Sequence, residues 1–280
     1  MTLEVRPRAV DEKSAAVAGE LTLGRQTIRL PNRFPTSSEI RAARSWKLLE
    51  SIEGPVLAVT RLMSTDLLKA ASSEEEAWQR FAKGVTADLR SLPGAPKLLY
   101  LSFRSADFEE VDQLRTFLDL QHLLGFEPVT VQYGTSPSLE DFLSAFGFAR
   151  SWARERGVDH LMPVFPPLEN RQKALGLMES LLDRGASALG LDLRGGFPYQ
   201  TLRAVEELKG ERPELWIHAF QVHPKVRFGG GLLQASLGMV LPYYGVDSFC
   251  RWIVPPPPQP VRKERVNFFD PGGWGVLKEG

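Results

Sequence analysis

The chain has 280 residues, 43% of them hydrophobic and 24% charged, so it can bury a sizeable core and is not a disordered protein. Lys plus Arg and Asp plus Glu balance at 34 each, which excludes a global charge that would attract polyanions. The single cysteine, Cys250, excludes an intramolecular disulfide and a cysteine-cluster zinc site.

The opening residues lack the apolar core of a signal peptide, and no stretch approaches the roughly 18 apolar residues of a membrane span. We therefore expect a soluble, cytoplasmic protein with no membrane partner. With one cysteine and four scattered histidines, we also expect no bound metal and no cofactor.

Short apolar runs alternate along the chain with longer segments of helical periodicity, after an expected hairpin at 20–30. The runs predict eight strands, at 33–36, 55–60, 97–103, 128–133, 161–165, 188–193, 215–220 and 246–253. The segments between them predict seven helices, at 37–52, 64–91, 107–124, 138–156, 169–184, 198–209 and 230–242.

Alternating strands and helices are typical of α/β proteins with a parallel sheet. An open doubly wound sheet usually carries a glycine-rich phosphate loop after its first strand, and none follows Thr36. We therefore predict a (β/α)8 TIM-type barrel over 1–253, with the hairpin at its start and a proline-rich tail at 254–280.

The tail combines prolines at 255–258 and 260 with basic residues and then the apolar Val266, Phe268, Phe269 and Trp274. The prolines predict a stiff polyproline segment. One interpretation is a ligand for another domain; the other is a strut that returns the aromatic residues to pack on the barrel.

Side chains of a barrel strand alternate between the helix layer and the interior. Leu189, Leu191 and Leu193 suit the helix layer, so Asp192 and Arg194 should point inward. The polar residues that this alternation places near the mouth of the barrel, where barrel enzymes keep their sites, are Arg104, Gln132, Asp192, Arg194, His218 and Cys250. Each also has a structural interpretation, such as an ion pair for Asp192 with Arg194 or a core histidine for His218.

Two segments carry a family resemblance. Gly-Glu-Leu-Thr-Leu-Gly-Arg at 19–25, running into 28–31, resembles the hairpin before the first barrel strand of tRNA-guanine transglycosylases, and 218–220 and 244–249 resemble that family's last two strands. The resemblance spans about 20–253. It implies a glycosyltransferase of tRNA modification that exchanges guanine for a deazaguanine through an aspartate nucleophile.

The family's functional residues carry over only in part. Asp247 is kept, but the nucleophile position holds Cys250, the third strand reads Ser-Phe-Arg at 102–104 instead of Asp-Ser-Gly-Gly, and Gln132 replaces a base-reading carboxylate. The family's zinc-binding cysteines are missing. We expect that standard guanine exchange is lost.

Three hypotheses therefore stay open. The first is an altered base-exchange enzyme with catalytic Asp247, Cys250 or Asp192, and with Arg104, Gln132, Arg194 and His218 binding a nucleobase or nucleoside. The second is a non-catalytic paralogue that binds tRNA or DNA through a local basic patch, or forms a homo-oligomer or a complex with a partner subunit. The third is an unrelated barrel enzyme.

Overall fold

The structure is a computed structural model, and it describes residues 2–43, 56–63, 65–90, 94–103, 111–132, 138–223, 226–228, 233–235 and 237–251. Two expectations lie outside this part of the chain. These are the placement of Arg104 and the packing of the tail at 254–280.

The N-terminal region forms an antiparallel sheet of β1 (Leu3–Val10), β2 (Val17–Leu23) and β3 (Gln26–Leu30). The strands β2 and β3 contain the expected hairpin and turn at Gly24, which has a φ of 60°. The strand β1 was not predicted, because only Val5 in it is buried and Pro7 interrupts it. Such a sequence is typical of an edge strand, and the register shifts just after Pro7.

The parallel strands form two sheets. One has six strands in the order β4 (Asn32–Phe34), β13 (Ser248–Arg251), β10 (Ile217–Val222), β9 (Leu189–Asp192), β8 (Leu161–Phe165) and β7 (Val129–Gln132). The other pairs β5 (Leu57–Met63) with β6 (Lys97–Phe103). All eight overlap the predicted strands, with ends that differ by three residues or fewer.

Helices alternate with these strands. They are α1 (Ser37–Ala43), α3 (Thr65–Ser73), α4 (Glu75–Leu89), α5 (Val111–Leu123), α6 (Leu139–Arg156), α7 (Arg171–Asp183) and α8 (Tyr199–Glu211). The chain is therefore a mixed α/β protein whose six-stranded parallel sheet alternates with helices, an arrangement compatible with a barrel-like fold.

The prediction of one continuous helix over 64–91 is wrong. The segment forms two helices, α3 and α4, and Glu74 between them has extended backbone angles. Ser72 and Ser73 donate hydrogen bonds back to the carbonyl of Lys69 at the end of α3. Serine side chains that bond to the backbone in this way compete with continued helix.

The helix predicted over 230–242 is also wrong. The described residues there form β12 (Leu233–Ala235), which pairs with β11 (Val226–Phe228), then the four-residue α9 (Leu237–Val240) and the 3-10 turn η2 (Leu241–Tyr244). Gly238 and Pro242 are poor residues for the interior of a long helix, and so the segment stays short.

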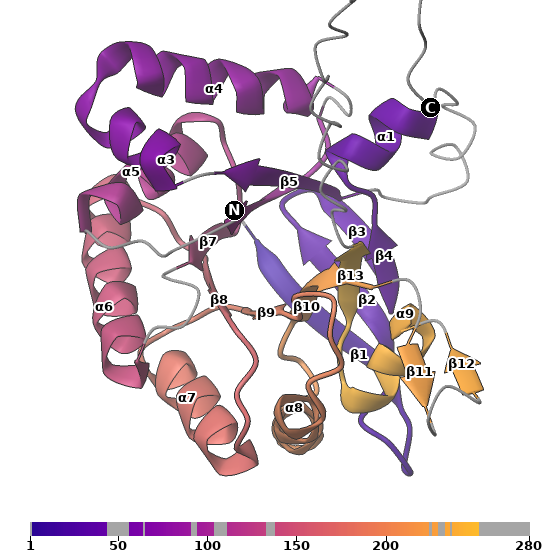
Figure 1. Ribbon diagram of the computed structural model, residues 1–280. Helices are drawn as coiled ribbons and strands as arrows, with labels where there is room; N and C mark the ends of the chain where they lie inside the picture. The colour runs from indigo at the N-terminus through magenta and orange to yellow at the C-terminus, as the bar shows by residue number, and fades with distance from the viewer. Residues whose placement is uncertain are drawn as a thin grey trace, which may run out of the picture.

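Two hydrophobic cores lie on opposite faces of the parallel strands. Leu189, Leu191 and Leu193 pack on the helix side, which confirms the predicted alternation. Phe34, Tyr100 and other alternate residues pack with apolar side chains of β1–β3 in a second cluster. Figure 1 shows the helices α3 to α8 in an arc outside the strands. The N-terminal sheet therefore covers the face that the helices leave open.

The edges of the two parallel sheets meet through side chains between β6 and β7. The amide of Gln132 accepts a hydrogen bond from Leu101 N at 2.9 Å and donates one to Leu101 O at 3.0 Å. The side-chain amide of Gln121, on α5, accepts a hydrogen bond from Thr130 N and donates one to Thr130 O, each at 2.8 Å. Two buried glutamines thus supply the partners that a main-chain ladder would otherwise supply.

Replacing Gln132 by leucine should destabilise the fold. The change leaves the N–H and C=O of Leu101 buried without these partners, and we expect a loss of about 2–4 kcal/mol in the free energy of unfolding. Chemical denaturation measures it. Gln79→Leu, at a hydrogen-bonded but exposed position on α4, is the matched control and should change stability by no more than about 0.5 kcal/mol. Equal effects of the two variants would contradict a structural role for Gln132.

Candidate functional site at the strand ends

The predicted site residues divide between the two ends of the parallel strands. Asp192 and Gln132 are the last residues of β9 and β7, and Cys250 is the third residue of β13. Asp247 precedes β13, and His218 is the second residue of β10, so both lie toward the amino ends. The structure therefore brings together only part of the predicted set.

Asp192 is the centre of a polar cluster at the carboxyl ends. Arg194 donates from its backbone N to Oδ1 at 3.2 Å and from Nε to Oδ2 at 3.0 Å, and Tyr100 is a third donor to the carboxylate. Burial raises the pKa of Asp192 above its ordinary value, while these donors favour the charged form. Arg194 has a φ of 47°, which is uncommon for a residue with a side chain and is a mark of local strain.

An aromatic floor lies beneath this cluster. The rings of Tyr100 and Phe220 stack with centroids 4.9 Å apart, and both side chains are buried. Gly190 is required beside them, because a Cβ there would lie 2.7 Å from Val164 Cγ2 and 3.1 Å from the Phe220 ring. Burial also raises the pKa of Tyr100 well above its ordinary value, so its phenol remains a donor to Asp192.

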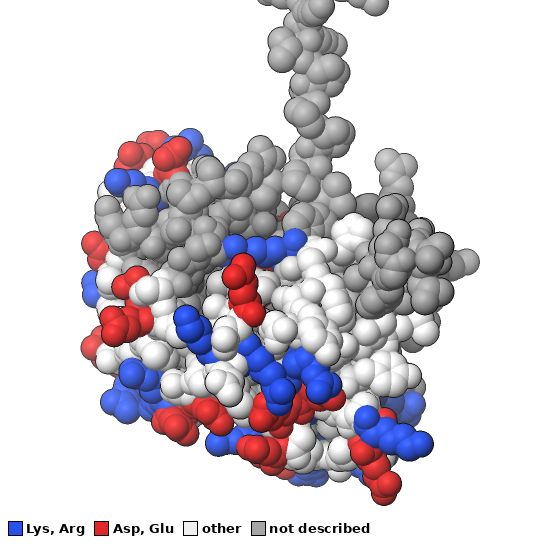
Figure 2. Space-filling model, turned by 60° about the horizontal axis from the view of Figure 1, so that its bottom comes forward, with Lys and Arg blue, Asp and Glu red and all other residues white. Residues whose placement is uncertain are grey.

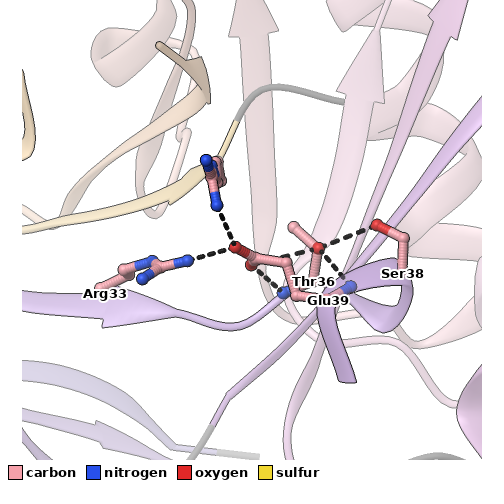
Figure 3. Close-up of polar contacts among 5 residues, drawn as sticks. Arg33, Thr36, Ser38 and Glu39 are labelled. Carbon is pink, nitrogen blue, oxygen red and sulfur yellow. Dashed lines mark hydrogen bonds and ion pairs between the residues drawn. The ribbon is translucent and has the colours of Figure 1, made fainter. Parts of the chain in front are cut away.

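A second polar cluster, centred on Glu39, lies at the ends of β4 and β13 (Figure 3). Glu39 Oε2 accepts from Thr36 N at 3.1 Å, and Glu39 N donates to Thr36 Oγ1 at 3.2 Å, which is a reciprocal capping box at the start of α1. The other oxygen, Oε1, pairs with Arg33 and, at 3.7 Å, with Arg251. Glu39 therefore ties β4, α1 and β13 together.

Neither Tyr100 nor Glu39 was predicted as a site residue. The spacing Thr-x-x-Glu at 36–39 is a sequence signal for a capping box, which would have identified Glu39. Nothing in the sequence pairs Tyr100 with Asp192, since the two residues come from strands that are not neighbours in either sheet.

Cys250 lies between the two clusters but inside the core. Burial raises the pKa of its thiol to about 12, and the charges of Glu39 and Asp192 add to this rise, whereas Arg33 opposes it. The thiol is therefore protonated at neutral pH. A protonated, fully buried thiol is a poor nucleophile.

His218 is enclosed by aromatic rings. It stacks on Phe34 with centroids 5.1 Å apart, and its Nδ1 shares a 2.8 Å hydrogen bond with Ser248 Oγ, which also accepts from Trp216 Nε1. Within the described part of the chain, its Nε2 has no hydrogen-bond partner. Burial lowers the pKa of His218 to about 3, so the ring is neutral near pH 7.

Asp247 forms a buried ion pair with Lys209 at 2.8 Å and accepts a hydrogen bond from Ile217 N. Lys209 also donates to Leu215 O. Burial raises the pKa of Asp247 to about 6, although Lys209 favours the carboxylate. These contacts join α8 to the amino ends of β10 and β13, away from Asp192.

Charge on the surface is mixed. Figure 2 shows acidic and basic side chains next to each other over one face of the molecule. Exposed ion pairs such as Arg171–Glu207, at 2.6 Å, also place opposite charges side by side.

The described residues contain no group of three or more His, Cys, Asp or Glu side chains arranged to hold a metal ion. Each of their helices is too short or too polar to cross a bilayer.

The fold and the site together define an α/β protein with a buried carboxylate at the ends of its parallel strands. Comparison with known proteins adds no family: no protein-family model matches the chain, and no curated protein matches it in sequence. The resemblance to transglycosylases therefore stays a hypothesis.

The neutral His218 predicts a loss of stability in acid. Its folded pKa of about 3 lies below the ordinary 6.5, so the unfolded chain binds a proton first and stability falls as pH falls below 6.5. We expect this residue to contribute about 3 kcal/mol of destabilisation between pH 7 and pH 4.

The measurement is guanidinium unfolding of wild type and His218→Asn across this pH range. Asparagine keeps a polar atom near the Nδ1 position but does not titrate, so the acid slope should decrease. The same change at the exposed His122 should leave the slope as in wild type. An unchanged slope in His218→Asn would show that His218 binds a proton as readily in the folded chain as in the unfolded chain, which contradicts the effect of burial.

Proposed function

We propose that the eight parallel strands close into a barrel and that its mouth binds a nucleobase-type ligand through Asp192, without base exchange. This is a non-catalytic or altered relative of the transglycosylases, as the resemblance at 19–31, 218–220 and 244–249 implies. The observation that carries the proposal is the buried Asp192 carboxylate at the strand ends.

Closure of the barrel is supported at both junctions between the two sheets. On one side, Thr36 and Ala58 form a parallel bridge, and Ala58 N donates to Pro35 O at 3.0 Å. On the other, Gln132 bonds to the backbone of Leu101, and Thr130 Oγ1 donates to Leu99 O at 2.5 Å, so two side chains of β7 join it to β6. Eight strands joined in a ring would place Asp192 and Arg194 at one mouth, with Tyr100 and Cys250 buried beneath them.

The chemistry of Asp192 suits a guanine-type ligand. The adjacent ring N–H and exocyclic amine of guanine are donors, and a carboxylate accepts such donors well. Three donors of the described residues already approach the carboxylate, which offers about four acceptor positions, so one position is left for either the ring N–H or the amine of the ligand. The side chain of Arg194 is 38% exposed and lies beside this position, where it can donate to a ligand carbonyl.

The residues available for nucleophilic attack argue against exchange. A base-exchange nucleophile must stabilise the positive charge that develops at the ribose carbon and must leave again. The protonated thiol of Cys250 lacks the negative charge, and Asp247 is held by Lys209 at the other end of the strands. Ligand binding without turnover therefore fits the site best.

Binding should depend on the charge of Asp192. We expect Asp192→Asn to weaken binding of guanine and 7-deazaguanine by about 1.5–3 kcal/mol, or roughly 10–150-fold, since one charge-assisted hydrogen bond is lost. Equilibrium dialysis with labelled base measures this. Glu207→Gln removes a carboxylate from a surface ion pair and should leave affinity unchanged. A wild type that binds neither base would refute the proposal, as would an Asp192→Asn protein of full affinity.

Guanine exchange should be undetectable. The assay is incorporation of labelled guanine or 7-deazaguanine into tRNA and into DNA by the wild type, with Cys250→Ala and Asp247→Ala as comparisons. We expect no incorporation above background for any of the three. Turnover by the wild type that Cys250→Ala or Asp247→Ala abolishes would overturn the proposal and identify the nucleophile.

A further inference from the structure

An apolar groove lies beside the outer face of β4 and β13, away from Asp192. Its volume is about 490 Å³, and we call it the α9 groove. The residues that line it include Pro31, Arg33, Met239, Pro242, Tyr243 and Phe249. Gly238 packs so closely on Phe249 that any Cβ there would lie 2.3 Å from the Phe249 ring. These two residues therefore leave no space between them, whereas Met239 and Tyr243 face solvent.

The walls carry two large side chains with unusually high exposure. Met239 is 74% exposed and Tyr243 is 61% exposed, although large hydrophobic side chains are usually buried. Two such side chains on one groove leave apolar surface exposed to solvent, and exposed apolar surface beside a groove commonly marks a docking site. The chain itself offers an occupant.

Residues 266–270, Val-Asn-Phe-Phe-Asp, combine three apolar side chains with a terminal carboxylate. Their aromatic residues gain from burial against apolar walls. The carboxylate of Asp270 is complementary to Arg33, which lines the same groove and, besides its pair with Glu39, keeps half of its side chain exposed. No other stretch of 252–280 places two adjacent aromatic residues directly before an acidic one.

The path of the chain permits this contact. Phe249 lines the groove, and β13 ends two residues later at Arg251, so the tail begins beside its own proposed site. The intervening residues 252–265 reach at most roughly 50 Å when extended, which is ample for a return to the groove. The prolines at 255–260 reduce the entropy that such a return costs.

We propose that residues 266–270 dock in the α9 groove, with Phe268 and Phe269 against Met239 and Tyr243 and with Asp270 beside Arg33. The tail then acts as an intramolecular cover for this surface. Removal of the aromatic side chains would expose the groove for another partner.

Oxidation of Met239 by hydrogen peroxide tests the proposal in the full-length protein. A methionine that reacts only when undocked slows in proportion to the undocked fraction, so a tail docked for about nine-tenths of the time slows oxidation about tenfold. We therefore expect Phe268→Asp/Phe269→Asp to speed oxidation of Met239 about tenfold over wild type, as followed by peptide mass spectrometry. Val276→Asp/Leu277→Asp changes two apolar residues of the same tail and should leave the rate as in wild type.

Equal rates in wild type and both variants would overturn the proposal. Protection that disappears on dilution and does not depend on Phe268 and Phe269 would also overturn it, because a second copy of the chain would then be the cover.

Disulfide trapping gives an independent readout of position. Cys250 is buried with a raised pKa, so engineered cysteines react alone. The pair Met239→Cys/Phe268→Cys should form an intrachain disulfide much faster than Leu123→Cys/Phe268→Cys, in which position 123 is exposed on α5. Equal rates for the two pairs, or disulfides only between chains, would contradict docking in the α9 groove.

Discussion

Every backbone N–H and C=O of a strand that is buried on both faces needs a hydrogen-bond partner, and this constraint shapes the whole molecule. Where β6 and β7 meet, Gln132 and Gln121 satisfy it with side-chain amides. The consequence extends to the site. Tyr100 lies on β6 and Asp192 on β9, and the two can meet only if the β5–β6 pair is held against the larger sheet.

Burial, more than the identity of each residue, decides what the polar groups of this protein can do. The same cause keeps the Cys250 thiol protonated, keeps His218 neutral and raises the pKa of Asp247. Asp192 differs because its carboxylate lies at the strand ends, beside an Arg194 side chain that reaches solvent. A reactive centre needs both a charge and access, and among the described residues of the predicted set Asp192 and Arg194 combine them best.

The N-terminal sheet packs on the interior face of the parallel strands, whereas the residues around β13 border a groove on the outside. The β1–β3 sheet contributes side chains such as Leu21 and Ile28 to the cluster around Phe34 and Phe220, so the interior face of the strands is packed rather than hollow. On the outside, Phe249 and Met239 leave an apolar groove beside the last strand. In our proposals the mouth is the ligand site and the tail covers this groove, so the two surfaces serve separate roles.

The sequence by itself determined the alternation of strands and helices, because period-two burial in runs such as 188–193 and helical periodicity between them are local properties. It also determined that Asp192 stands at a strand end. Only the tertiary structure decided that Gln132 joins two strands, that His218 is enclosed by Phe34 and Trp216, and that Asp247 pairs with Lys209. These contacts join residues that are mostly about thirty or more positions apart, and the packing of a polar side chain against a distant strand has no signature in the residues next to it.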